Sequence, residues 1–79
     1  MNTATTKQIL SNIKDGDIFS LQNDIEILKQ RIERIKRKNN NTTKEDLFMI
    51  WIYEQNIKSK EKLIEAIENK YKELVKEEK

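Results

Sequence analysis

The chain has 79 residues, of which 38% are charged, and its 16 lysines and arginines against 14 acids give a formal net charge of +2. Such a length allows one domain at most, with about 60% of the unfolded surface buried, so we expect marginal stability and self-association. Histidine, cysteine and proline are absent and glycine occurs once, which excludes disulfides, thiol nucleophiles and imidazole metal ligands and favours long helices over sheet.

The first residues predict a short helix over residues 5–14. Thr5 and Gln8 have the spacing of a capping box at its start. Its apolar face consists of Ile9, Leu10 and Ile13. We expect the helix to end at an Asp-Gly-Asp sequence, because Gly16 can take the left-handed conformation that closes a helix and Asp17 can cap the next one.

The next element, expected over residues 17–38, has the most regular pattern in the chain. Aliphatic side chains recur at alternating steps of three and four residues, which places them along one stripe of an α-helix. The stripe consists of Ile18, Leu21, Ile25, Leu28, Ile32 and Ile35. Because no stripe position is polar, we expect this helix to lie lengthwise against another helix.

A polar loop is expected over residues 39–43, because its successive asparagines compete for their own backbone. Thr42 and Thr43 each precede an acid by three residues, so either can cap the next helix. The three-and-four pattern then resumes and predicts a helix over residues 44–77. Its stripe contains Ile50, Tyr53, Ile57, Lys60, Ile64, Ile67, Tyr71 and Leu74.

Two long helices joined by a short polar loop predict an antiparallel, coiled-coil-like hairpin. This packing sets the lysines beside the first stripe against the glutamates beside the second, whereas a parallel pair of the first long helix would bring Arg31 close to a second copy of Lys36. The order of isoleucine and leucine along the first stripe favours a parallel dimer of this helix, so it competes with the charge pattern, which favours the antiparallel hairpin. We favour the hairpin because its ends are tethered.

The predicted register places Ile35 beside Ile50 and Ile18 beside Ile67, which leaves Tyr71 and Leu74 beyond the start of the first long helix. We expect the short N-terminal helix, or a second chain, to cover this overhang. The predicted fold is therefore all-α: one domain over residues 1–79, with two long helices in a hairpin, a short helix packed on them, and assembly into an oligomer.

Several large apolar side chains lie off the two stripes. Leu47, Phe48 and Trp51 point broadly away from the stripe of the last helix, and Phe19 and Ile27 lie off that of the preceding one. Exposed aromatic clusters are typical of contact surfaces, so these five residues are candidates for a protein interface. The competing interpretation places them in the core of a bundle or homodimer.

A basic segment ends the first long helix. It contains Lys29, Arg31, Arg34, Lys36, Arg37 and Lys38, with Glu33 as its single acid. This density could engage several phosphates of DNA or RNA, but cations also stabilise the C-terminal turn of a helix, and we favour a solvated face. A helix-turn-helix over residues 47–71, bent at residues 56–59, is a further alternative, although an uninterrupted helix fits the same residues.

No residue pattern indicates catalysis. The glutamates of the last helix lack the pocket that a general acid or base needs, and no phosphate-binding glycine loop or set of metal ligands is present. We therefore expect no enzyme, no cofactor, no bound metal and no small-molecule substrate. The chain has no apolar run near 20 residues and no pattern of a secretion signal, so we expect no membrane association and a cytoplasmic location.

The function that these patterns favour is a non-enzymatic regulator or adaptor that self-associates and binds another protein. A phage or mobile-element product that modulates a host factor would have this size and composition. Two alternatives remain: a small DNA- or RNA-binding protein that uses the basic segment, and a structural coiled-coil oligomer whose only partner is itself.

Overall fold

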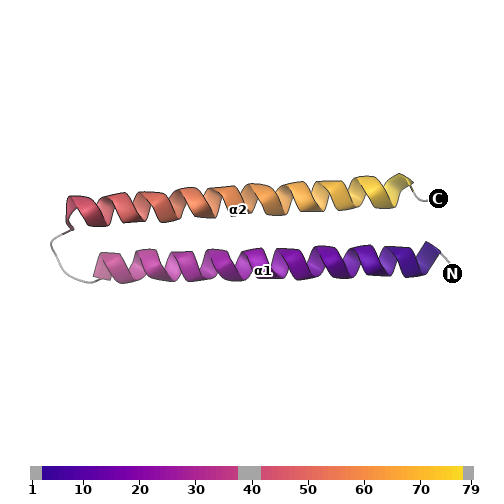
Figure 1. The fold of residues 1–79 in the computed structure, drawn as a ribbon, viewed down its shortest axis with the longest axis horizontal. Helices are drawn as coiled ribbons and strands as arrows, with labels where there is room; N and C mark the ends of the chain where they lie inside the picture. Colours follow the sequence, from indigo (N-terminus) through magenta and orange to yellow (C-terminus); the bar gives the residue numbers. More distant parts are fainter. Residues whose placement is uncertain (1–2, 38–41, 78–79) are drawn as a thin grey trace.

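The computed structural model of the chain describes residues 3–37 and 42–77, which form two long helices (Figure 1). Helix α1 spans Thr3–Arg37 and helix α2 spans Lys44–Glu77. The helices lie side by side and antiparallel, with both termini at one end of a molecule that measures 61 × 15 × 11 Å. The prediction of an all-α antiparallel hairpin is confirmed.

Helix α1 runs without interruption through the Asp-Gly-Asp sequence at which we expected a break. Gly16 does not adopt a positive φ, and the helix already includes Thr3. The separate helix over residues 5–14 and the capping box of Thr5 and Gln8 are therefore wrong. The physical reason is that one glycine inside a helix costs only about 1 kcal/mol relative to alanine, which packing against α2 outweighs.

Two cation–π contacts define the register of the hairpin. The Lys14 Nζ atom lies 4.4 Å from the ring centroid of Tyr71, and the Arg31 Cζ atom lies 5.9 Å from that of Tyr53. These contacts agree with the register derived from the sequence. The first turns of α1 cover the end of α2 by continuing straight, and not by folding over it.

The two stripes form the core. Ile25, Ile32 and Ile50 are only 7%, 7% and 8% exposed and are the buried hydrophobic residues of the described chain. The half-buried stripe positions are Ile18, Leu21, Leu28, Ile35, Tyr53, Ile57, Lys60, Ile64, Ile67 and Tyr71. A hairpin has a single seam, so most core side chains keep contact with solvent, in agreement with the expected marginal stability.

A capping box starts α2. The Thr43 backbone N donates to Asp46 Oδ2 at 3.2 Å, and the Asp46 backbone N donates to Thr43 Oγ1 at 3.1 Å. The backbone N of Leu47 donates to the Thr43 carbonyl at 3.1 Å, which closes the first turn. Of the two threonines that the sequence offered as caps, Thr43 is the one that the structure uses, whereas the expected loop residues 39–41 lie outside the described part of the chain.

Helix α2 continues through residues 56–59, where the alternative helix-turn-helix required a bend. Within this stretch, Asn56 Nδ2 donates to the carbonyl of Ile52 one turn earlier, at 3.1 Å. The side chain therefore bonds to a helical carbonyl without interrupting the helix. The helix-turn-helix over residues 47–71 is wrong, and the uninterrupted helix is confirmed.

Candidate protein-binding surfaces

Three side chains near the start of α2, Leu47, Phe48 and Trp51, form a surface that we term the aromatic patch. They are 57%, 61% and 55% exposed. The Phe48 and Trp51 rings stack, with centroids 6.3 Å apart and planes inclined by 15°. Since neighbouring rings restrict each other's rotation, the patch needs little further ordering to bind a partner.

The position of the patch follows from the seam. Ile50 is buried and Tyr53 is half-buried against α1. At roughly 100° per residue, the side chains of the patch are then turned out to solvent. The capping box at Thr43 holds the preceding helical turn in place. The patch therefore stands on an anchored part of the helix.

Phe19 and Ile27, the other two predicted interface residues, are not part of this patch. Phe19 is 71% exposed but lies on α1, roughly 20 Å along the hairpin from Trp51 at 1.5 Å per residue. Ile27 is 41% exposed and lines a shallow hollow with Tyr53 and Asn56. The structure therefore divides the predicted interface among three places.

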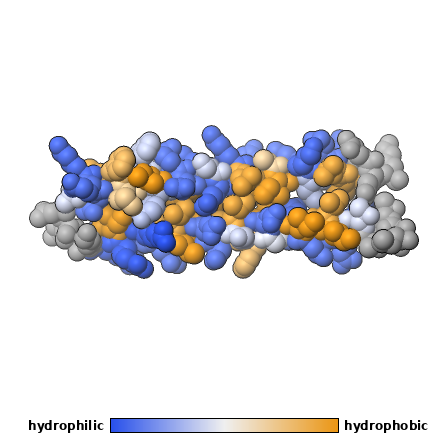
Figure 2. All heavy atoms as spheres, in the orientation of Figure 1, coloured by the Kyte–Doolittle hydropathy of each residue, from blue (hydrophilic) through white to orange (hydrophobic). Residues whose placement is uncertain are grey.

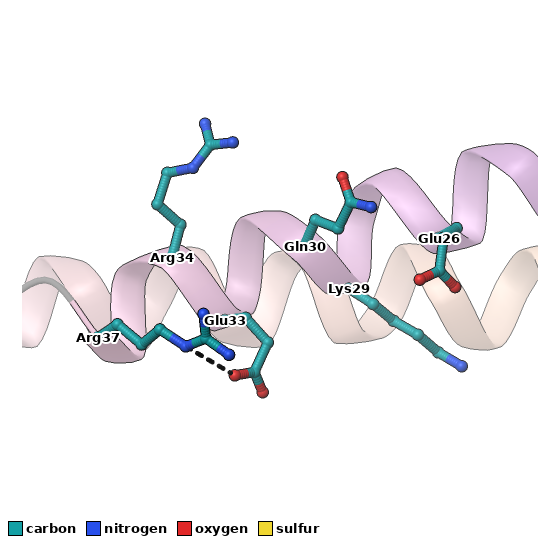
Figure 3. Close-up of a pocket in the computed structure, with 6 residues that line it drawn as sticks. All are labelled: Glu26, Lys29, Gln30, Glu33, Arg34 and Arg37. Atoms are coloured by element: carbon teal, nitrogen blue, oxygen red, sulfur yellow. Dashed lines mark ion pairs between the residues drawn. The ribbon is translucent and has the colours of Figure 1, made fainter.

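The basic segment does not form one continuous surface. Figure 3 shows an open hollow on α1 lined by Glu26, Lys29, Gln30, Glu33, Arg34 and Arg37. Arg37 Nε lies 3.7 Å from Glu33 Oε2, while Arg34 points away from this pair. Two acids thus lie among the three basic side chains, which weakens the positive potential that phosphates would meet.

The other basic residues lie elsewhere. Arg31 lies over Tyr53 and lines a different hollow, and Lys36 is an exposed residue near the end of α1. Lys38 lies outside the residues that the structure describes. Nucleic-acid binding by this segment stays a prediction.

A second surface, which sequence reasoning missed, runs along the line where the helices meet. Three shallow hollows lie on it, lined by side chains of both helices. Its repeating positions are Asp17, Asp24 and Arg31 of α1 and Asn56, Leu63 and Lys70 of α2. Each set recurs every seven residues and so stays on one side of its helix. We term this surface the groove face.

The groove face combines apolar and charged side chains. Its most exposed apolar residues are Ile13 at 56%, Leu63 at 49%, Ile27 at 41% and Leu74 at 38%. Figure 2 shows that hydrophobic atoms gather in patches over both helices on one broad side of the molecule, with hydrophilic atoms between them. The signal in the sequence was a set of apolar residues beside the stripes, such as Ile13, Ile27 and Leu63, which share one face only once the helices are aligned.

Over residues 3–37 and 42–77, no group of three or more acidic side chains is placed to hold a metal ion. In the same residues, neither helix contains a segment both long and apolar enough to cross a bilayer. Comparison of the sequence and the structure with protein-family models, curated proteins and solved structures finds no significant match. Function is therefore inferred from the surfaces alone.

Proposed function

We propose that the protein is a non-enzymatic adaptor or regulator that binds another protein through the aromatic patch. The observation that supports this proposal is the stacked pair of Phe48 and Trp51, each more than half exposed on a rigid helical turn. Large aromatic side chains are enriched among the residues that dominate binding energy, because they bury much area with few rotatable bonds.

The shape of the patch favours one binding mode. Leu47, Phe48 and Trp51 lie within about one helical turn and project from a single helix, so they form a ridge and not a hollow. A ridge of this kind fits a hydrophobic groove on the partner, as in the insertion of an amphipathic helix into a groove. The proposed partner therefore supplies the concave surface.

Self-association is the second part of the proposal. Among its described residues, the hairpin buries three hydrophobic side chains and leaves ten large ones more than a third exposed. A second copy would cover part of this surface. The small size and the abundance of isoleucine, lysine and asparagine suit a phage or mobile-element product that modulates a host factor.

Affinity capture tests the docking part. Two tagged single variants of the patch, Trp51→Glu and Phe48→Glu, are compared with the unchanged chain. Phe19→Glu is the matched control, because it replaces an exposed aromatic residue outside the patch. We expect a protein that is retained by the unchanged chain and by Phe19→Glu and is lost with both patch variants, while the helical circular dichroism of all four stays the same.

Two results would contradict the proposal. Equal retention by the patch variants would show that the patch is not the docking site. A chain that assembles in sedimentation experiments but retains only itself would instead indicate a purely structural coiled-coil oligomer.

A further inference from the structure

The groove face carries Asp17 and Asp24 together with Lys14 and Arg31 on α1, and Lys60 and Lys70 on α2. Asp17 of α1 and Lys70 of α2 line one hollow, and Asp24 of α1 and Lys60 of α2 line another. An acid of α1 is therefore level with a lysine of α2 at two positions along the hairpin. Lys70 Nζ also lies 3.2 Å from Glu73 Oε1, but such an exposed pair contributes only about 0–1 kcal/mol and can exchange partners.

Apolar side chains occupy the space around these charges. Ile13 and Ile27 of α1 and Leu63 and Leu74 of α2 are exposed on the same face. Their spread along both helices offers an apolar contact much longer than the aromatic patch. A partner for this face must therefore be long, carry apolar side chains along its length, and be charged in the complementary order.

A second copy of the chain meets these requirements in one of two face-to-face arrangements. With the two-fold axis along the hairpin, α1 packs on α2 of the other copy at the same level, so Asp17 meets Lys70 and Asp24 meets Lys60. With the axis across the hairpin, α1 packs on α1 in the opposite direction. An axis level with Asp24 then sets this acid against its own copy and Lys60 near its own copy, and only Asp17 meets an opposite charge, that of Arg31. Charge complementarity selects the first arrangement.

We propose that two copies of this chain pack groove face to groove face, with the two-fold axis along the hairpin, to form a four-helix bundle in which the two hairpins are parallel and neighbouring helices are antiparallel. This inference rests on the self-association part of the proposed function and names its surface and its geometry. A face of 61 × 15 Å has a projected area of about 900 Å², which matches the roughly 800 Å² that each partner buries in a stable complex.

The arrangement leaves the aromatic patch accessible. Trp51 and Asn56, a groove-face residue, are roughly 140° apart around α2 at about 100° per residue, so the patch points away from the dimer contact. The parallel orientation places both patches at the same end of the bundle, on opposite sides. The dimer would thus present two docking sites for the proposed protein partner.

Charge reversal tests the contact. Sedimentation equilibrium is measured for the unchanged chain and for two double variants, one with Asp17→Lys and Asp24→Lys and one with Lys60→Glu and Lys70→Glu. A fourfold variant combines all four changes. We expect the unchanged and fourfold chains to dimerise and both double variants to dissociate at least tenfold more readily. Glu26→Lys with Glu33→Lys, on the outer side of α1, is the matched control and should dimerise normally.

Circular dichroism separates a lost dimer from a lost fold, because the reversed charges also lie near each other within one hairpin. A double variant that keeps its helical signal and sediments as a monomer supports the contact. If a double variant unfolds, Leu63→Gln, which changes the same face without reversing a charge, should weaken the dimer alone. A Leu63→Gln chain that dimerises as strongly as the unchanged chain would overturn the proposal.

Orientation is tested with energy transfer between dyes on Thr42→Cys, at the loop end of the hairpin. Mixed donor- and acceptor-labelled chains should transfer efficiently in the parallel dimer, whereas the other arrangement would separate the dyes by nearly the 61 Å length of the molecule. Weak transfer within an established dimer would overturn the parallel geometry.

These outcomes differ from those that bear on docking. A monomeric unchanged chain would overturn this inference together with self-association, but would leave docking to the capture experiment. A dimer that dissociates with Trp51→Glu and persists in both double variants would show that the aromatic patch, and not the groove face, joins the copies.

Discussion

The Lys14 ammonium group lies over the ring of Tyr71, 4.4 Å from its centroid, and joins the early turns of α1 to the late turns of α2. With the contact between Arg31 and Tyr53 it sets one register along the whole hairpin. It also shows what happens at the expected break: α1 stays straight, so that residues before Gly16 reach the end of α2.

The register can be tested by a disulfide, since the chain has no native cysteine. We expect Lys14→Cys with Tyr71→Cys to oxidise readily within one chain, because the two side chains meet across the seam. Lys14→Cys with Ile64→Cys, displaced by two turns of α2, is the control and should oxidise far more slowly. Non-reducing electrophoresis separates intrachain from interchain products, and equal rates for both pairs would contradict the register.

Replacement of Gly16 by alanine should stabilise the protein by about 1 kcal/mol, because alanine is the better helix former and an added Cβ meets no atom within 4 Å. Urea unfolding, followed by circular dichroism at one fixed protein concentration, measures the change in the free energy of unfolding. A loss of stability would indicate that the chain does bend at this position.

The capping box predicts a difference between two adjacent threonines. Thr43→Ala should destabilise the protein by about 1 kcal/mol, because it removes the hydroxyl that accepts a hydrogen bond from the Asp46 backbone N. Thr42→Ala is the matched control, one residue earlier, and we expect a change of less than about 0.5 kcal/mol. Comparable losses in the two variants would be inconsistent with a cap at Thr43.

The predictable part of the fold rested on local periodicity. The stripes through Ile25 and Ile50 sufficed for the hairpin and its register, since a spacing of three and four residues has one geometric solution on a helix. The two threonines, each followed three residues later by an acid, limited the start of the last helix to two adjacent positions, of which the structure uses Thr43. The break at Gly16 was wrong because a local signal for a helix end was weaker than the packing that continued the helix.

The sites were less predictable than the fold. Leu47, Phe48 and Trp51 were identified together because they lie within one turn of one helix, and the structure keeps them together and exposed. Phe19 and Ile27 were assigned to the same interface, but the structure places them elsewhere. A wheel shows on which side of its own helix a residue lies, but not which residues of another helix lie beside it.

By itself the sequence determined the all-α class, the seam between the two long helices and the outward direction of the aromatic residues, because each depends on spacing within one helix. Only the tertiary structure decided that α1 is continuous, that the basic side chains are dispersed around it, and that Asp17 and Asp24 share a face with Lys60 and Lys70. The physical reason is that a surface shared by two helices combines positions beside both stripes, and that the continuation of a helix depends on packing against residues far apart in the chain.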